Sequence, residues 1–294
     1  YVSVEIATNK YLDEHWAEAK TDFLRLYGSD TANFYVVNRL ANCYNKIFLP
    51  DSAMVYFNRA YVLNPRNLIN LRSLCVTGML LKDYKTGIAK TEQYLAMDST
   101  NGEMMPLNAY LYLLDKQYRQ SIGKNLKCLK NNIRTPQVLK NMGIAYYRLN
   151  AFDTAKTYLE QAYLMDTLDV NTVEFLSSAC LKSYFKEQGI FYYERYIELS
   201  GFDIHKYAEV YKNLYQACLS WTKCPKDKIL QVSLRAYQLN PESYDMLYTI
   251  AYYYDETEQD YATAIAYYKE YLSESKKFNK NVVHVGMHSM DEII

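Results

Sequence analysis

The chain has 294 residues, half of them hydrophobic, and contains only nine glycines and six prolines. This scarcity argues against a turn-rich all-β protein and is typical of long helices joined by short loops. The 33 basic residues balance the 33 acidic ones, so the chain lacks the net charge that would hold a nucleic acid or an anionic membrane.

Small and aromatic residues recur at helical spacing, most clearly at residues 34–67. The stretch RAYVLNP at 59–65 is nearly repeated by RAYQLNP at 235–241. Within 34–67 the recurring residues are Val37, Leu40, Ala41, Tyr44, Ala53, Phe57, Ala60 and Pro65. Their spacing matches W-x2-L-G-x2-Y, then A-x3-F-x2-A, then P, a 34-residue pattern. The segment therefore resembles the tetratricopeptide repeat (TPR) family, with Val37 replacing the Trp and Ala41 the Gly.

From the N-terminus onward, the same frame predicts eight units of two antiparallel helices each. Ala19 and Phe23 keep the frame one period earlier, and Gly143, Ala155 and Leu159 keep it three periods later. The more degenerate units between and after them remain in phase. The predicted units are 1–33, 34–67, 68–101, 102–135, 136–169, 170–203, 204–243 and 244–278, followed by a capping helix or tail at 279–294.

The second copy of the RAY motif lies 176 residues after the first, whereas five periods would give 170. We therefore expect six extra residues in the seventh unit, between Gly201 and Trp221, which lengthen its first helix or the preceding loop. One more insertion is expected before Tyr261.

The resemblance implies an all-α fold, a right-handed superhelical solenoid of about eight tandem helix hairpins. A single hairpin cannot bury its apolar face, but stacked hairpins bury a continuous core. Most of the 33 tyrosines are expected to pack in this core. Among them, Tyr44, Tyr112, Tyr146 and Tyr254 occupy the aromatic position between the helices.

The six cysteines lack the spacing of a zinc site, and we predict buried free thiols rather than disulfides. Cys218 and Cys224 are the only close pair. No catalytic or phosphate-binding motif is present among the four histidines and nine glycines. His284 and His288, with Asp291 nearby, could face a metal ion, but Gly286 weakens that helix. We predict no metal, no cofactor and no enzymatic activity.

In TPR proteins the first helices line a concave groove, and the second, fifth, ninth and twelfth residues of each unit contact the ligand. Asn38, Asn42 and Asn45 share one helical face, and an amide can donate to and accept from a peptide backbone at once. A solvated polar face is the alternative interpretation. By this rule the predicted contacts are Tyr35, Asn38, Asn42, Asn45, Arg72, Met79, Tyr110, Lys140, Ile144 and Tyr147.

This mixed lining suits an extended peptide or a partner helix. It departs from the carboxylate-clamp pattern of chaperone-binding TPR domains, because Asn38 and Leu107 stand where that pattern has Lys and Arg. The sequence thus predicts a non-catalytic scaffold that binds a peptide or partner protein, with no nucleic acid partner and no membrane-spanning segment.

Two alternatives remain open. The repeats could be the regulatory or substrate-recruiting region of a larger enzyme or sensor, or the chain could self-associate through the ends of its solenoid. The chain begins at Tyr1 rather than Met, so we expect an upstream segment, for instance a signal peptide. The resemblance to tyrosine- and asparagine-rich bacterial envelope proteins favours the cell envelope or periplasm over the cytoplasm.

Overall fold

A computed structural model describes residues 3–201, 204–242 and 244–278. The predicted tail at 279–294, with His284, His288 and Asp291, lies outside the described residues. The chain divides into two compact units, Tyr1–Asp166 and Thr167–Ile294, called unit 1 and unit 2 below. The described residues of both units form helices and no strands.

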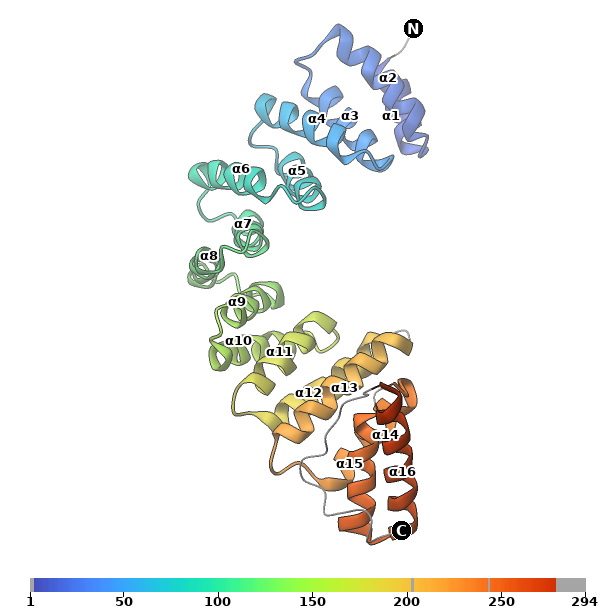
Figure 1. Ribbon diagram of the computed structural model, residues 1–294. Helices are drawn as coiled ribbons and strands as arrows, with labels where there is room; N and C mark the ends of the chain where they lie inside the picture. The colour runs from blue at the N-terminus through green and yellow to red at the C-terminus, as the bar shows by residue number, and fades with distance from the viewer. Residues whose placement is uncertain (1–2, 202–203, 243, 279–294) are drawn as a thin grey trace. The chain divides into compact units, whose positions relative to one another are not determined.

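Unit 1 is a succession of helix pairs, and the two members of each pair are joined by a short turn (Figure 1). Consecutive helices pack against each other, and the first helices of neighbouring pairs also contact, α1 with α3 and α7 with α9. The helices are α1 (Val4–Leu12), α2 (Trp16–Ser29), α3 (Phe34–Lys46), α4 (Pro50–Leu63), α5 (Leu68–Leu80), α6 (Tyr84–Met97), α7 (Met104–Leu114), α8 (Tyr118–Lys130), α9 (Pro136–Arg148) and α10 (Phe152–Met165).

Unit 2 continues the same pattern with three further pairs (Figure 1). A π-helical turn, η1, interrupts the last pair. The elements are α11 (Val170–Lys182), α12 (Lys186–Ser200), α13 (Ile204–Ser220), α14 (Lys226–Leu239), α15 (Asp245–Tyr253), η1 (Tyr254–Glu258) and α16 (Tyr261–Phe278). The predicted fold class, an all-α array of helix hairpins, is confirmed.

The turn between the helices of a pair has one backbone geometry throughout unit 1. Its residues with positive φ lie 34 positions apart: Glu14 (63°), Phe48 (59°), Lys82 (59°), Lys116 (60°) and Asn150 (61°). This left-handed conformation is costly for residues with a Cβ atom, and most of all for a bulky side chain such as that of Phe48. The period seen in the sequence is therefore also a period of the backbone.

Asparagine and threonine side chains fix where several first helices begin. The side chain of Asn33 accepts a hydrogen bond from the backbone N–H of Val36, at 3.2 Å, and that of Asn67 accepts one from Asn70, at 2.8 Å. Such N-caps satisfy a backbone donor that has no partner inside the helix. Thr135 caps α9 in the same way.

The core lies between the two helices of each pair and between neighbouring pairs. Phe57, Leu71 and Leu74 are fully buried members of one cluster that extends from α3 to α7. Three of the four frame tyrosines, Tyr44, Tyr146 and Tyr254, are half-buried and stack on a tyrosine of the second helix. The ring centroids of Tyr44 and Tyr56, for example, lie 5.3 Å apart. As predicted, all six cysteines are buried thiols.

The expected insertion in the seventh pair is divided between a helix and a loop. Helix α13 has 17 residues where α9 has 13, so four residues lengthen the first helix, as predicted. The following loop covers residues 221–225, whereas the loop after α9 covers only 149–151. These two further residues lie beyond the predicted interval. Pro225 explains the longer loop, because it disfavours helical geometry in the residue before it.

The second expected insertion, before Tyr261, coincides with the π-helical turn η1. A π turn has an i→i+5 hydrogen bond and absorbs one extra residue within a helix. The chain then reverses at Gln259, which has a positive φ of 56°.

Candidate partner-binding face

All ten predicted contact residues lie on first helices of unit 1, namely α3, α5, α7 and α9. Together with their neighbours Thr8, Tyr11 and Arg39 they are called the first-helix face below. These thirteen side chains come from helices of successive pairs.

Tyr35 belongs to a small aromatic and cationic cluster on this face. Its hydroxyl lies 3.0 Å from Oγ1 of Thr8 on α1. The guanidinium of Arg39 lies over two rings, 5.2 Å from the centroid of Tyr35 and 5.0 Å from that of Tyr11. Burial raises the pKa of Tyr11, against the opposing effect of Arg39. The cluster therefore holds a cation over two aromatic rings in fixed positions.

Asn38 and Asn42 form a chain of side-chain hydrogen bonds that ends in the next repeat. Nδ2 of Asn42 donates to Oδ1 of Asn38 at 3.2 Å and to its backbone carbonyl at 2.7 Å. Nδ2 of Asn38 donates to Oδ1 of Asn70 on α5, at 2.9 Å. The fully buried Asn70 donates in turn to the carbonyl of Phe57, at 3.2 Å. The asparagine face therefore links neighbouring repeats.

The side-chain amides of Asn42 and Asn45 keep hydrogen-bonding groups that a partner could use. Among the described residues no donor reaches Oδ1 of Asn42, which stays half-buried at the surface. Asn45, one turn further along α3, is also half-buried and makes no side-chain hydrogen bond with a described residue. A peptide N–H could therefore bond to either amide.

The predicted contacts on α5 and α7 play different roles. Arg72 is exposed, and its guanidinium lies 3.4 Å from the carboxylate of Glu103. Met79 packs against the core cluster that contains Phe57. Its side chain therefore contributes mainly to the core and offers little surface to a partner. Tyr110 is half-buried on α7.

Helix α9 carries Lys140, Ile144 and Tyr147, all half-buried. The ring of Tyr147 contacts that of Phe152 edge-on, with centroids 5.5 Å apart, and the guanidinium of Arg148 lies 6.0 Å from the Tyr147 centroid. Here too an aromatic ring is fixed by its neighbours before any partner binds.

The position rule missed Arg39, Tyr11 and Asn70. Arg39 follows Tyr35 by four residues, so simple helical spacing would have placed both on one face. Tyr11 lies on another helix, and its contact with Arg39 has no signal in the sequence. Asn70 is the last residue of the NPRNLIN stretch at 64–70, three residues after Asn67, and its role depends on the packing of α4 against α5.

Across the described ranges, no group of three or more His, Cys, Asp or Glu side chains is arranged to hold a metal ion. No helix in the same part of the chain is both long and apolar enough to cross a membrane. Burial raises the pKa of Cys43 and of Cys75 to about 12.

Comparison with solved structures shows similarity to helical-repeat proteins. The C-terminal part of a TPR repeat-containing protein from Cytophaga hutchinsonii covers 84% of this chain and 99% of its own, with a TM-score of 0.64 and 16% identity. A tetratricopeptide repeat protein from Parabacteroides merdae covers 84% and 95%, with a TM-score of 0.59 and 12% identity.

PilF from Pseudomonas aeruginosa covers 78% of this chain and all of its own, with a TM-score of 0.54 and 16% identity. No protein-family model and no curated protein sequence matches the chain. The likeness thus rests on structure, and it agrees with the 34-residue repeat. The chain has the fold of the tetratricopeptide repeat proteins.

Proposed function

We propose that this chain is a protein-interaction scaffold that binds an extended peptide segment of a partner protein at the first-helix face of unit 1. The observation that supports this most strongly is Arg39, held over the rings of Tyr11 and Tyr35. Arginine and tyrosine are among the residue types that most often dominate the energy of a protein interface.

The second support is preorganisation. Side chains that are already fixed by neighbours lose little conformational entropy when a partner binds. Tyr35 is fixed by Thr8, and Asn42 by Asn38, while Oδ1 of Asn42 remains available to a backbone N–H. Aromatic rings, a cation and amides in succession can recognise both the side chains and the backbone of an extended segment. None of these roles requires a catalytic step.

Selection from a random peptide library displayed on phage tests the proposal. Peptides that bind the purified chain are measured again with the Arg39→Ala variant and with Arg59→Ala, an exposed arginine on the second helix α4. We expect Arg39→Ala to weaken binding at least about tenfold, which corresponds to 1.4 kcal/mol. Arg59→Ala should change it less than about twofold. Equal effects of the two variants, or a library that yields no binding peptide, would contradict the proposal.

A further inference from the structure

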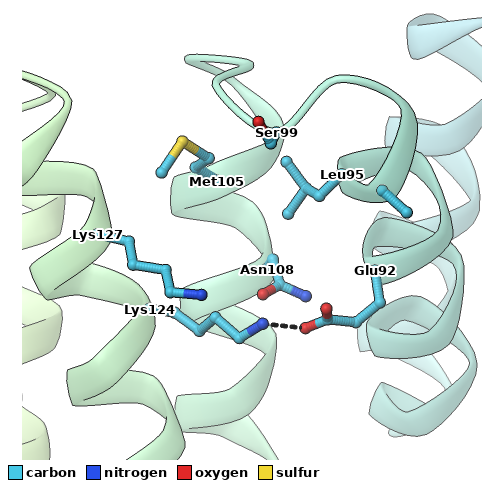
Figure 2. Close-up of a pocket in the computed structure, with 8 residues that line it drawn as sticks. Glu92, Leu95, Ser99, Met105, Asn108, Lys124 and Lys127 are labelled. Atoms are coloured by element: carbon cyan, nitrogen blue, oxygen red, sulfur yellow. Dashed lines mark hydrogen bonds and ion pairs between the residues drawn. The ribbon is translucent and has the colours of Figure 1, made fainter.

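A cavity of about 210 Å³ lies in unit 1 between α6, α7 and α8, away from the predicted contacts (Figure 2). Asn108 lines it from α7. Tyr110, the predicted contact on α7, follows two residues later, about 200° around the helix, so the cavity and the first-helix face lie on different sides of α7. The lining residues are Glu92, Leu95, Ala96, Ser99, Met105, Asn108, Lys124 and Lys127.

One wall of the cavity is an ion pair between Glu92 on α6 and Lys124 on α8. The hydroxyl of Tyr112 also donates to Oε1 of Glu92, at 3.2 Å. Burial opposes the charged form of Glu92, but the hydrogen bond and charge of Lys124, with the bond from Tyr112, bring its pKa below the ordinary value. The carboxylate is therefore ionised at neutral pH, and its charge is balanced within the protein.

Asn108 has a polar atom that lacks a partner in the protein. The residue is fully buried, and its Oδ1 accepts no hydrogen bond from any described group. Its orientation is fixed by Thr91, whose hydroxyl donates to the carbonyls of Gly87 and Ile88 and thus accepts from Nδ2 of Asn108, at 2.9 Å. Figure 2 shows the Asn108 oxygen on the side of the lysines. A buried acceptor without a donor destabilises the protein, and a ligand donor that reaches it would remove this penalty.

The other walls provide one positive charge and an apolar surface. Lys127 is exposed and makes no ion pair with a described residue. Leu95, Ala96 and Met105 line the apolar part, and Met105 is only 6% exposed. The cavity therefore combines a hydrogen-bond acceptor, a positive charge and an apolar surface. These features complement a ligand that carries a hydrogen-bond donor, a negative charge and an aliphatic group.

We propose that this cavity binds an N-acylated aliphatic amino acid, the chemistry that the C-terminal residue of a peptide carries. The amide N–H donates to Oδ1 of Asn108, the carboxylate accepts from Nζ of Lys127, and the side chain packs against Leu95 and Met105. An inorganic anion has neither the N–H donor nor the apolar group. An internal aliphatic residue of a peptide has no carboxylate, and a metal cation is repelled by the two lysines.

The proposal is independent of the first-helix face, and a small probe tests it directly. N-acetyl-leucine is titrated into the protein while the methyl signal of Met105 is followed by NMR, with N-acetyl-leucinamide and N-acetyl-N-methyl-leucine as comparison probes. We expect saturable binding of the acid, and at least about tenfold weaker binding of the uncharged amide and of the probe without an N–H. Equal binding of the acid and the amide would overturn the proposal.

Surface variants provide the matched control. Lys127→Gln should weaken binding of the acid roughly threefold to tenfold, whereas Lys130→Gln, an exposed lysine on the same helix, should leave it unchanged. Identical effects of these two variants would overturn the assignment of Lys127. If Arg39→Ala weakened binding of N-acetyl-leucine, the probe would bind at the first-helix face and not in the cavity, which would also overturn the proposal. A pentapeptide that ends in leucine and binds more tightly than N-acetyl-leucine identifies a peptide as the ligand source; equal affinity identifies a small molecule.

Discussion

Asn38 donates a hydrogen bond from Nδ2 to Oδ1 of Asn70, 2.9 Å away on the first helix of the next repeat. Because Asn70 is fully buried, this bond satisfies an acceptor that water cannot reach. The face predicted from sequence as a peptide contact therefore also joins two repeats. Substitutions that remove Asn38 test stability as well as binding.

We expect Asn38→Ala to lower the free energy of unfolding by about 1–2 kcal/mol, because Oδ1 of Asn70 is left without a donor. Asn45→Ala is the matched control, since it removes the same side chain from the same helix without breaking a hydrogen bond to a described residue. It should change stability by less than about 0.5 kcal/mol. Urea denaturation followed by circular dichroism measures both, and equal losses would show that the bond to Asn70 contributes nothing.

Gly143 lies at a close contact between α9 and α10. A Cβ atom there would lie 2.4 Å from Cγ of Leu159 and 3.2 Å from the carbonyl oxygen of Ala155. Gly143→Ala should therefore destabilise the protein by about 1–3 kcal/mol. Gly123→Ala on α8, where a Cβ meets nothing within 4 Å, should instead stabilise it by about 0.5–1 kcal/mol. Thermal denaturation of the two variants should give shifts of opposite sign, and shifts of one sign would refute the packing argument.

Phe48 holds a bulky side chain in the left-handed conformation, with a φ of 59°, and is 89% exposed. Phe48→Gly should relieve the strain, and Phe48→Ala should remove the ring but keep the strained Cβ. We expect the glycine variant to be more stable than the alanine variant by about 1 kcal/mol. The urea midpoints of the two variants decide this, and an alanine variant of equal or greater stability would show that the turn is not strained.

The buried thiol of Cys75 predicts a loss of stability in alkali. Burial raises its pKa from 9.0 to about 12, so the unfolded chain releases this proton before the folded one does. The contribution to stability is complete below pH 9 and is lost as the pH rises towards 12.

The measurement compares the natural protein with Cys75→Ala. At pH 8 their difference in the free energy of unfolding reflects packing alone, since the thiol is neutral in both states. Above pH 9 the difference should narrow by up to about 1.4 kcal/mol per pH unit. A difference that stays constant from pH 8 to 10.5 would mean that Cys75 does not titrate as proposed.

The fold followed from sequence because its main determinants are local and periodic. Ala41, Gly143 and Ala155 mark helix surfaces that must approach closely, and their spacing repeats with the turn geometry. The extra residues of the seventh pair were predicted for the same reason, although Pro225 extended the loop further than the motif spacing could show.

The candidate sites were harder to predict, because they depend on contacts between helices. Nothing in the sequence places Tyr11 against Arg39, or Thr91 against Asn108, since each pair joins separate helices through specific rotamers. The family's ligand positions lie on the first helices. Glu92 and Lys124 lie on second helices, 32 residues apart, and their ion pair is visible only in the structure.

The shared backbone geometry of Glu14, Phe48, Lys82, Lys116 and Asn150 also bears on how such a chain can grow. These residues have no common side-chain chemistry, so the turn is specified by its place between two helices. A segment such as 49–82 begins and ends at the same point of the backbone pattern. Duplicating or deleting it in a single genetic event would leave every remaining turn intact, which makes the number of repeats in unit 1 an easily varied trait.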